Sequence, residues 1–159
     1  MPIMDAQLLF SEAQDITADS GNSVVSEDVV LIPQVKDHTE TARNDRINQA
    51  GKLYFNVVVE DVDLLAAVDG AVVTIALMND TDSVPTTGGD TIITKDITVN
   101  TLAANYVDGT LIMSVPLPAQ TYKPYFGVLY SVATQNLSAG SVTAWIGGQV
   151  QAGGEHGAL

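Results

Sequence analysis

Short stretches in which apolar and polar residues alternate recur along this chain, and this period of two constrains its fold more than any other feature. In residues 53–60, every second residue from Leu53 to Val59 is apolar. Side chains of a strand point alternately to its two faces, so the pattern predicts half-buried strands. We expect strands in the runs that share it: residues 53–60, 72–78, 91–99, 111–115, 126–132 and 142–150, with two or three more from residues 7–10, 16–18 and 29–32.

Turn-forming residues lie between these runs. Asp108-Gly109 precedes residues 111–115, and Ala139-Gly140 precedes residues 142–150; such pairs favour tight turns. Helical composition is confined to residues 11–14 and 62–68, and both stretches are short. Seven to nine short strands predict an all-β fold, an antiparallel β-sandwich of jelly-roll type with short or no helices. A closed barrel is the alternative that the pattern leaves open.

The charge balance limits the partners that this chain can have. Its 159 residues hold 19 acids and six bases, a formal net charge of -13, and four of the bases crowd into residues 36–52. We therefore expect no nucleic-acid partner, because phosphate contacts need clustered lysines and arginines. We expect no membrane partner either, since the longest nearly apolar run, residues 70–78, is far shorter than the roughly 20 residues that span a bilayer.

The residues that carry catalysis are scarce, so the chain is not expected to be an enzyme. There is no cysteine, and the two histidines, His38 and His156, lie in polar stretches without a partner motif. Asp80-Thr81-Asp82 and residues 60–63 place carboxylates at alternate positions, which suits a hard cation, but neither continues as a calcium-binding loop. We expect turn caps there and predict no metal site and no cofactor. Whether Asp80 and Asp82 bind a cation stays open.

Two features suggest surfaces for a partner. Trp145, the only tryptophan, falls on the face of its strand opposite Val142, Ala144 and Ile146. In a sandwich that face meets solvent, so the indole either docks a partner or folds over its own sheet. Leu8, Leu9 and Phe10 lie in an apolar start without bases. This segment either adds a strand to a neighbour's sheet or forms the protein's own first strand.

Three stretches resemble, in the same order, the capsid cement (decoration) proteins of short-tailed bacteriophages. The first is DAQLLFSEAQDIT at residues 5–17, with an apolar pair before Phe-Ser-Glu-Ala-Gln and a threonine shortly after. The second is RINQAGKLY at residues 46–54. The third is YFGVLY at residues 125–130, followed by AGSVTA at 139–144 and QVQ at 149–151.

The resemblance implies a single jelly-roll domain over residues 1–159, with an extended N-terminal segment and a flexible tail from about residue 152. Residues 33–45 and the tail after Gln151 depart from the family's pattern. By the same resemblance, the protein binds the outside of an icosahedral head and stabilises contacts between copies of the major capsid protein. It also implies a small homo-oligomer, a homodimer rather than a trimer.

A second class of function also fits a β-sandwich. A carbohydrate- or receptor-binding module needs an aromatic platform, and Trp145, Tyr122 and Tyr125 are the residues available for one. Copurification with intact virus particles separates the two expectations, because a lectin-like module is retained on glycans and is absent from heads.

Overall fold

The computed structural model describes residues 8–31, 35–36, 42–43, 53–61, 63–64, 70–83, 89–99, 106–120 and 122–150. Within these ranges the regular structure consists of strands, and no helix has the length and apolarity that crossing a membrane requires. The strands are β1 (Leu9–Asp15), β2 (Ser23–Val25), β3 (Val30–Leu31), β4 (Val35–Lys36), β5 (Ala42–Arg43), β6 (Tyr54–Val59), β7 (Val72–Asp80), β8 (Asp90–Thr98), β9 (Leu111–Pro116), β10 (Tyr125–Ala133) and β11 (Ser141–Gly147).

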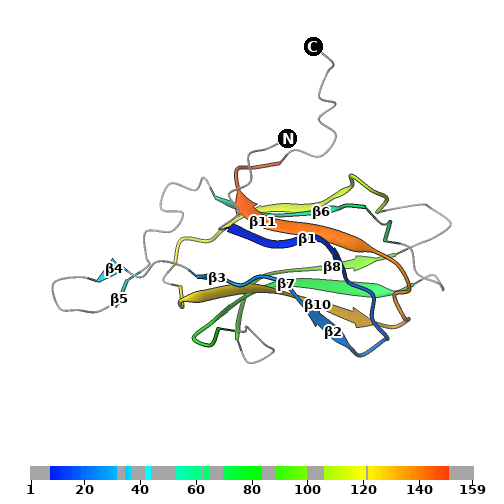
Figure 1. Ribbon diagram of the computed structural model, residues 1–159, viewed down its shortest axis with the longest axis horizontal. Helices are drawn as coiled ribbons and strands as arrows, with labels where there is room; N and C mark the ends of the chain where they lie inside the picture. Colours follow the sequence, from blue (N-terminus) through cyan, green and yellow to red (C-terminus); the bar gives the residue numbers. More distant parts are fainter. Residues whose placement is uncertain are drawn as a thin grey trace, which may run out of the picture.

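Two antiparallel sheets face each other and form a sandwich (Figure 1). The first has the order β1-β11-β6-β9, and the second has the order β2-β10-β7-β8 with β3 also pairing β10. Leaving aside the two-residue strands β3, β4 and β5, the strands pair from the ends of the chain inward. Strand β1 pairs β11, β2 pairs β10, β6 pairs β9, and β7 pairs β8 in a hairpin. This nesting is that of one long antiparallel ribbon folded over itself, so the sandwich is a jelly roll, as the sequence predicts. The short strands β4 and β5 pair with each other alone among the described strands.

The core lies between the two sheets and is built from the inward-facing residues of the alternating runs. The phenyl rings of Phe10 on β1 and Phe55 on β6 meet edge to face, with centroids 6.1 Å apart. Burying one such ring contributes about 1.5–3 kcal/mol. The largest fully buried side chains are Tyr130, Phe10, Phe55, Phe126, Ile16, Leu64, Ile75, Leu77, Leu137, Val57, Val59 and Val73.

Three buried polar side chains join the two sheets at one side of the sandwich, and we call them the intersheet clamp: Ser11 and Gln14 on β1, and Tyr130 on β10. The Ser11 hydroxyl donates to Gln14 Oε1 at 2.6 Å and lies 2.9 Å from the Tyr130 hydroxyl. Because the single proton of Ser11 is directed at Gln14, the phenol donates to Ser11. Gln14 Nε2 donates to the Val25 carbonyl at 2.8 Å, which ties β2 into the same network.

Strand β1 is irregular where this network forms. Its pairing with β11 shifts register between Leu9 and Ser11 and again between Ser11 and Gln14. Ala13 lies there with φ 46°, and its N–H donates to Thr143 Oγ1 at 2.9 Å. The helical composition of residues 11–14 therefore does not produce a helix. The bulged strand turns both Ser11 and Gln14 toward the other sheet, which a regular period of two does not do.

The observed strands also differ from the predicted runs in other places. The last strand ends at Gly147 and not at Val150, because residues 148–150 leave the sheet. Residues 16–18 contribute a single bridge, from Ala18 to Leu137, where a short strand was expected. Strand β2 was not predicted, since SVV is too short to show a period.

Replacing Phe10 with aspartate should unfold the domain, because a carboxylate would be buried without a partner among apolar side chains. Phe10→Ala should instead lower the free energy of unfolding by about 3–5 kcal/mol. The matched control is Leu31→Asp, because that side chain is 61% exposed and Phe10 is 0% exposed. Circular dichroism and denaturant titration measure all three variants, and a natively folded Phe10→Asp variant would contradict the placement of this ring in the core.

Stability should fall in alkali above about pH 10. Burial raises the pKa of Tyr122 to about 12 and raises that of Tyr130 further. An unfolded tyrosine loses its proton near pH 10, so the folded state holds more protons above that pH and loses stability as pH rises. Denaturant unfolding between pH 8 and 12 measures the decline, which should be smaller in Tyr130→Phe. An equal decline in that variant would assign the effect to other groups.

Candidate functional site

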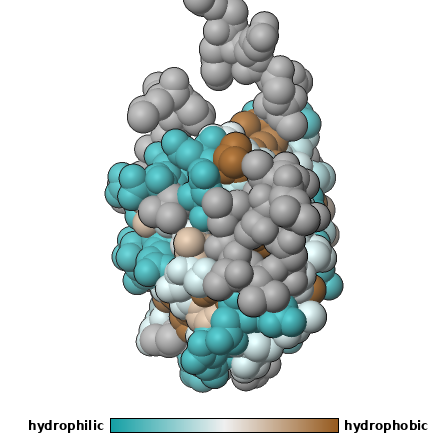
Figure 2. Space-filling view, turned by 90° about the vertical axis from the view of Figure 1, so that its right-hand side faces the viewer, coloured by the Kyte–Doolittle hydropathy of each residue, from teal (hydrophilic) through white to brown (hydrophobic). Residues whose placement is uncertain are grey.

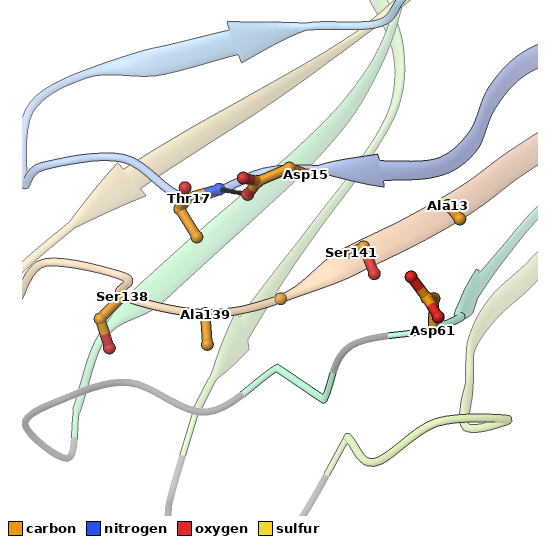
Figure 3. A pocket seen from close by; sticks show the side chains of 8 residues that line it. Ala13, Asp15, Thr17, Asp61, Ser138, Ala139 and Ser141 are labelled. Carbon is orange, nitrogen blue, oxygen red and sulfur yellow. Dashed lines mark hydrogen bonds between the residues drawn. The ribbon is translucent and has the colours of Figure 1, made fainter.

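A pocket of about 300 Å³ lies where the end of β1, Asp61 beyond β6 and the segment entering β11 come together. Its eight lining residues carry two carboxylates and three hydroxyl groups, and none is basic: Ala13, Asp15, Thr17, Asp61, Ser138, Ala139, Gly140 and Ser141. The Asp15 carboxylate turns toward Thr17 and away from Asp61 (Figure 3). The pocket is thus open to a polar or cationic group.

The polar groups of the pocket mainly hold its walls in place. Asp15 Oδ1 accepts the N–H of Thr17 at 2.8 Å, and the Ser141 hydroxyl donates to the Glu60 carbonyl. A serine nucleophile instead needs a base that accepts its proton. His38 and His156, the histidines considered from the sequence, both lie outside the described residues. The two bonds described here, from Thr17 N–H to Asp15 and from Ser141 to the Glu60 carbonyl, join the pocket side chains to the backbone.

The two acidic motifs form turn caps in the structure. Asp80 Oδ1 accepts the N–H groups of Thr81 at 2.6 Å and Asp82 at 3.3 Å. The bond from Asp82 is the main cause that lowers the pKa of the Asp80 carboxyl, against the opposing effect of burial. Among the described residues, no three side chains of metal-binding type come together.

Residues 60–63 follow the same principle. The Asp63 carboxylate accepts the N–H of Asp108 at 2.6 Å, and the Asp108 carboxylate accepts the N–H of Asp61 at 3.1 Å. This reciprocal pair joins the end of β6 to the turn before β9. Asp80 and Asp63, one carboxylate from each motif that suggested a cation, therefore accept bonds from backbone donors.

The structure places the four predicted interface residues in different surroundings. Phe10 is a fully buried core residue within β1. Leu8 and Leu9 are half-buried, and Leu8 packs against the main core. Residues 8–15 thus form the protein's own first strand region, which was one of the two alternatives.

Trp145 does lie on the outer face of its sheet, but it is only 6% exposed. In register it pairs Leu9 on β1 and Asn56 on β6. The indole lies over Gly147, where an added Cβ would come within 3.1 Å of the ring atoms Cδ1 and Nε1. The tryptophan therefore folds along its own sheet, and the glycine after it makes the room.

Residues 148–150 cross the same outer face, which the sequence pattern did not indicate. Asn56 Nδ2 donates to the Gly148 carbonyl at 3.0 Å, and the Ser114 hydroxyl donates to Asn56 Oδ1 at 2.7 Å. The N–H of Val150 donates to the same Ser114 hydroxyl at 3.1 Å. These bonds cover the fully buried Asn56 and stabilise the end of the described chain against β6 and β9.

Replacing Gly147 with alanine should displace the indole of Trp145, because the new methyl group comes too close to the ring. We expect a shift of the tryptophan emission and a loss of about 1–3 kcal/mol in the free energy of unfolding. Gly148→Ala is the matched control, since nothing lies within 4 Å of a Cβ there. The protein has one tryptophan, so its fluorescence reports this site alone. An unchanged emission in Gly147→Ala would refute the contact.

Comparison with known proteins gives a family for this chain. No curated protein matches the chain. The model of the Bbp16 family matches residues 10–146, a stretch that begins within β1 and ends within β11. Because this match covers most of the 159 residues, the chain belongs to the Bbp16 family.

Proposed function

We propose that this protein is a structural virion protein, a cement or decoration protein on the exterior of an icosahedral phage head. It binds the major capsid protein and stabilises contacts between neighbouring copies, and no catalytic step belongs to this role. The proposal starts from the resemblance of three stretches to phage cement proteins. The jelly-roll fold that this resemblance implies is also the fold of the chain.

One observation carries the proposal: the resembling stretches, far apart in sequence, meet in space. Residues 5–17 contain β1, residues 46–54 lead into β6, and residues 139–144 begin β11. These three strands are neighbours in one sheet. The motif Phe-Ser-Glu-Ala-Gln supplies Ser11 and Gln14 of the intersheet clamp, and the stretch at 125–130 supplies Tyr130. The likeness therefore covers one connected structural unit, which chance matches in separate loops would not form.

The charges of the sandwich support attachment to a basic partner surface. Sixteen of the 19 acids lie outside residues 36–52, together with two bases, Lys95 and Lys123. Both lysines are engaged within the chain: Lys95 Nζ donates to the Ile112 carbonyl at 2.6 Å, and Lys123 Nζ lies 2.8 Å from Asp90. Carboxylates thus dominate the charge that this part offers. Opposite charge on the capsid protein would steer association and fix the docking register.

A cement protein can attach to a shell through contacts that are each weak. Identical binding sites repeat over a capsid lattice, so a homodimer engages two of them at once and gains in apparent affinity without any new contact. Figure 2 shows one end of the molecule, where hydrophilic residues prevail among the coloured surface and a small apolar area lies near the upper edge.

The sugar-binding alternative loses much of its aromatic platform in the structure. Trp145 is nearly buried, and Tyr122 packs edge to face on Phe126 with centroids 4.9 Å apart. The Tyr122 hydroxyl donates to the Pro118 carbonyl. Tyr125 is half-buried at the start of β10, so one of the three rings offers a partly open face.

Binding to phage heads should weaken as salt rises, because charges on opposed surfaces are screened beyond about 8–10 Å at 0.1–0.15 M ionic strength. Purified protein is added to heads that lack it, and bound copies per capsid subunit are counted after sedimentation. Sucrose at matched osmolality is the control for non-ionic effects. We expect a saturating copy number comparable with that of the shell protein.

Two results would contradict the proposal. A chain that never sediments with heads at any salt concentration is not a cement protein. Retention on a glycan array together with absence from heads would favour the carbohydrate-binding alternative. A saturating but salt-independent attachment would keep the role and remove its electrostatic part.

A further inference from the structure

The side of the sandwich opposite the intersheet clamp is bordered by two edge strands. Among the described strands, β8 ends the second sheet and β9 ends the first, and the two are not paired with each other. An edge strand presents unpaired N–H and C=O groups, which form a template for pairing with another chain. With nine residues and mostly β-branched composition, β8 is the longer edge of the two.

A lysine occupies an inward-facing position in the middle of β8. Cross-strand neighbours share a face of the sheet, and β8 pairs Ile93 with Leu77, Lys95 with Ile75, and Ile97 with Val73. All three β7 partners are fully buried core residues, and Ile93 and Ile97 are buried as well. Lys95 therefore replaces an apolar residue in a core-facing row.

The ammonium of Lys95 bridges the opening between the sheets. Its Nζ donates to the carbonyl of Ile112 on β9 at 2.6 Å, while the residue as a whole stays exposed. The methylene stem covers the apolar border and the charged end stays near water, as is usual for lysine. At the start of the same strand, Asp90 is held by Lys123 at 2.8 Å.

The physical effect of this placement is to penalise an added strand. A strand that paired with β8 would extend the sheet and its core face past Lys95. The ammonium would then be enclosed between apolar side chains, and burying a charge without a paired counter-ion is costly. Inward-pointing charges on edge strands protect natural β-proteins in this way.

We propose that Lys95 keeps the β8 edge closed to strand addition by a second copy of this chain. The occupant excluded is another β8, because an identical long edge is present on every copy and no sequence match is needed for backbone pairing. The proposal is independent of the role on phage heads. It implies that oligomers of the native protein form through surfaces other than this edge.

The test compares Lys95→Met with Lys123→Met. The second variant also removes one positive charge near β8, where Lys123 lies beside Asp90, but it leaves the core-facing row of β8 unchanged. Light scattering after size exclusion measures mass against concentration for both variants and the wild type. We expect the mass of Lys95→Met to at least double over the wild type at high concentration. Lys123→Met and Lys95→Arg should match the wild type.

Hydrogen exchange then locates the new contact. In the larger species, amides of residues 90–98 should exchange more slowly than in the wild type, with folding verified by circular dichroism. The proposal is overturned if Lys95→Met keeps the wild-type mass, if Lys123→Met associates equally, or if protection appears away from β8. Should Lys95→Met fail to fold, Lys95→Gln replaces it, because this variant is polar but neutral, and it must show the same association.

Discussion

The hydrogen-bonded clamp between Ser11, Gln14 and Tyr130 is the interaction on which the architecture depends most. It is buried, it joins strands from two different sheets, and it connects the first strand to the second-last. Hydrogen bonds in such a low-dielectric site are strong when every partner is present and costly when one is missing. The bulge at Ala13 is the local strain that this arrangement requires, because it turns two near neighbours on β1 toward the same interior.

Both open sides of the sandwich are closed by polar groups. On one side lies the clamp, and next to it the N–H of Asp28 donates to the Phe10 carbonyl at 2.9 Å. On the other side the Lys95 ammonium reaches the Ile112 carbonyl. A partner is therefore left with faces and loops for its contacts. The acidic character of the protein outside residues 36–52 follows from its 16 carboxylates, against which stand only Lys95 and Lys123.

The strand positions were predictable to a large extent. Alternation placed six of the longer strands within a few residues of their observed bounds, since the period of two reflects directly which side chains face the core. It failed for β2, which is too short for a period, and for β1, where a bulge interrupts it. The candidate sites were less predictable. The alternation put Trp145 on the outer face, but it did not show that Gly147 lets the indole lie flat there.

By itself, the sequence determined the fold class and the charge, because hydrophobic period and composition are local properties that folding does not change. Tertiary structure decided which of two strand assignments Phe10 took, that the Asp63 carboxylate accepts the N–H of Asp108, and where residues 148–150 ended. Each of these outcomes depends on groups distant in sequence: Phe55 beneath Phe10, the backbone donors facing Asp63, and Ser114 beside Val150. No local pattern encodes such encounters, since they arise only when the ribbon folds over itself.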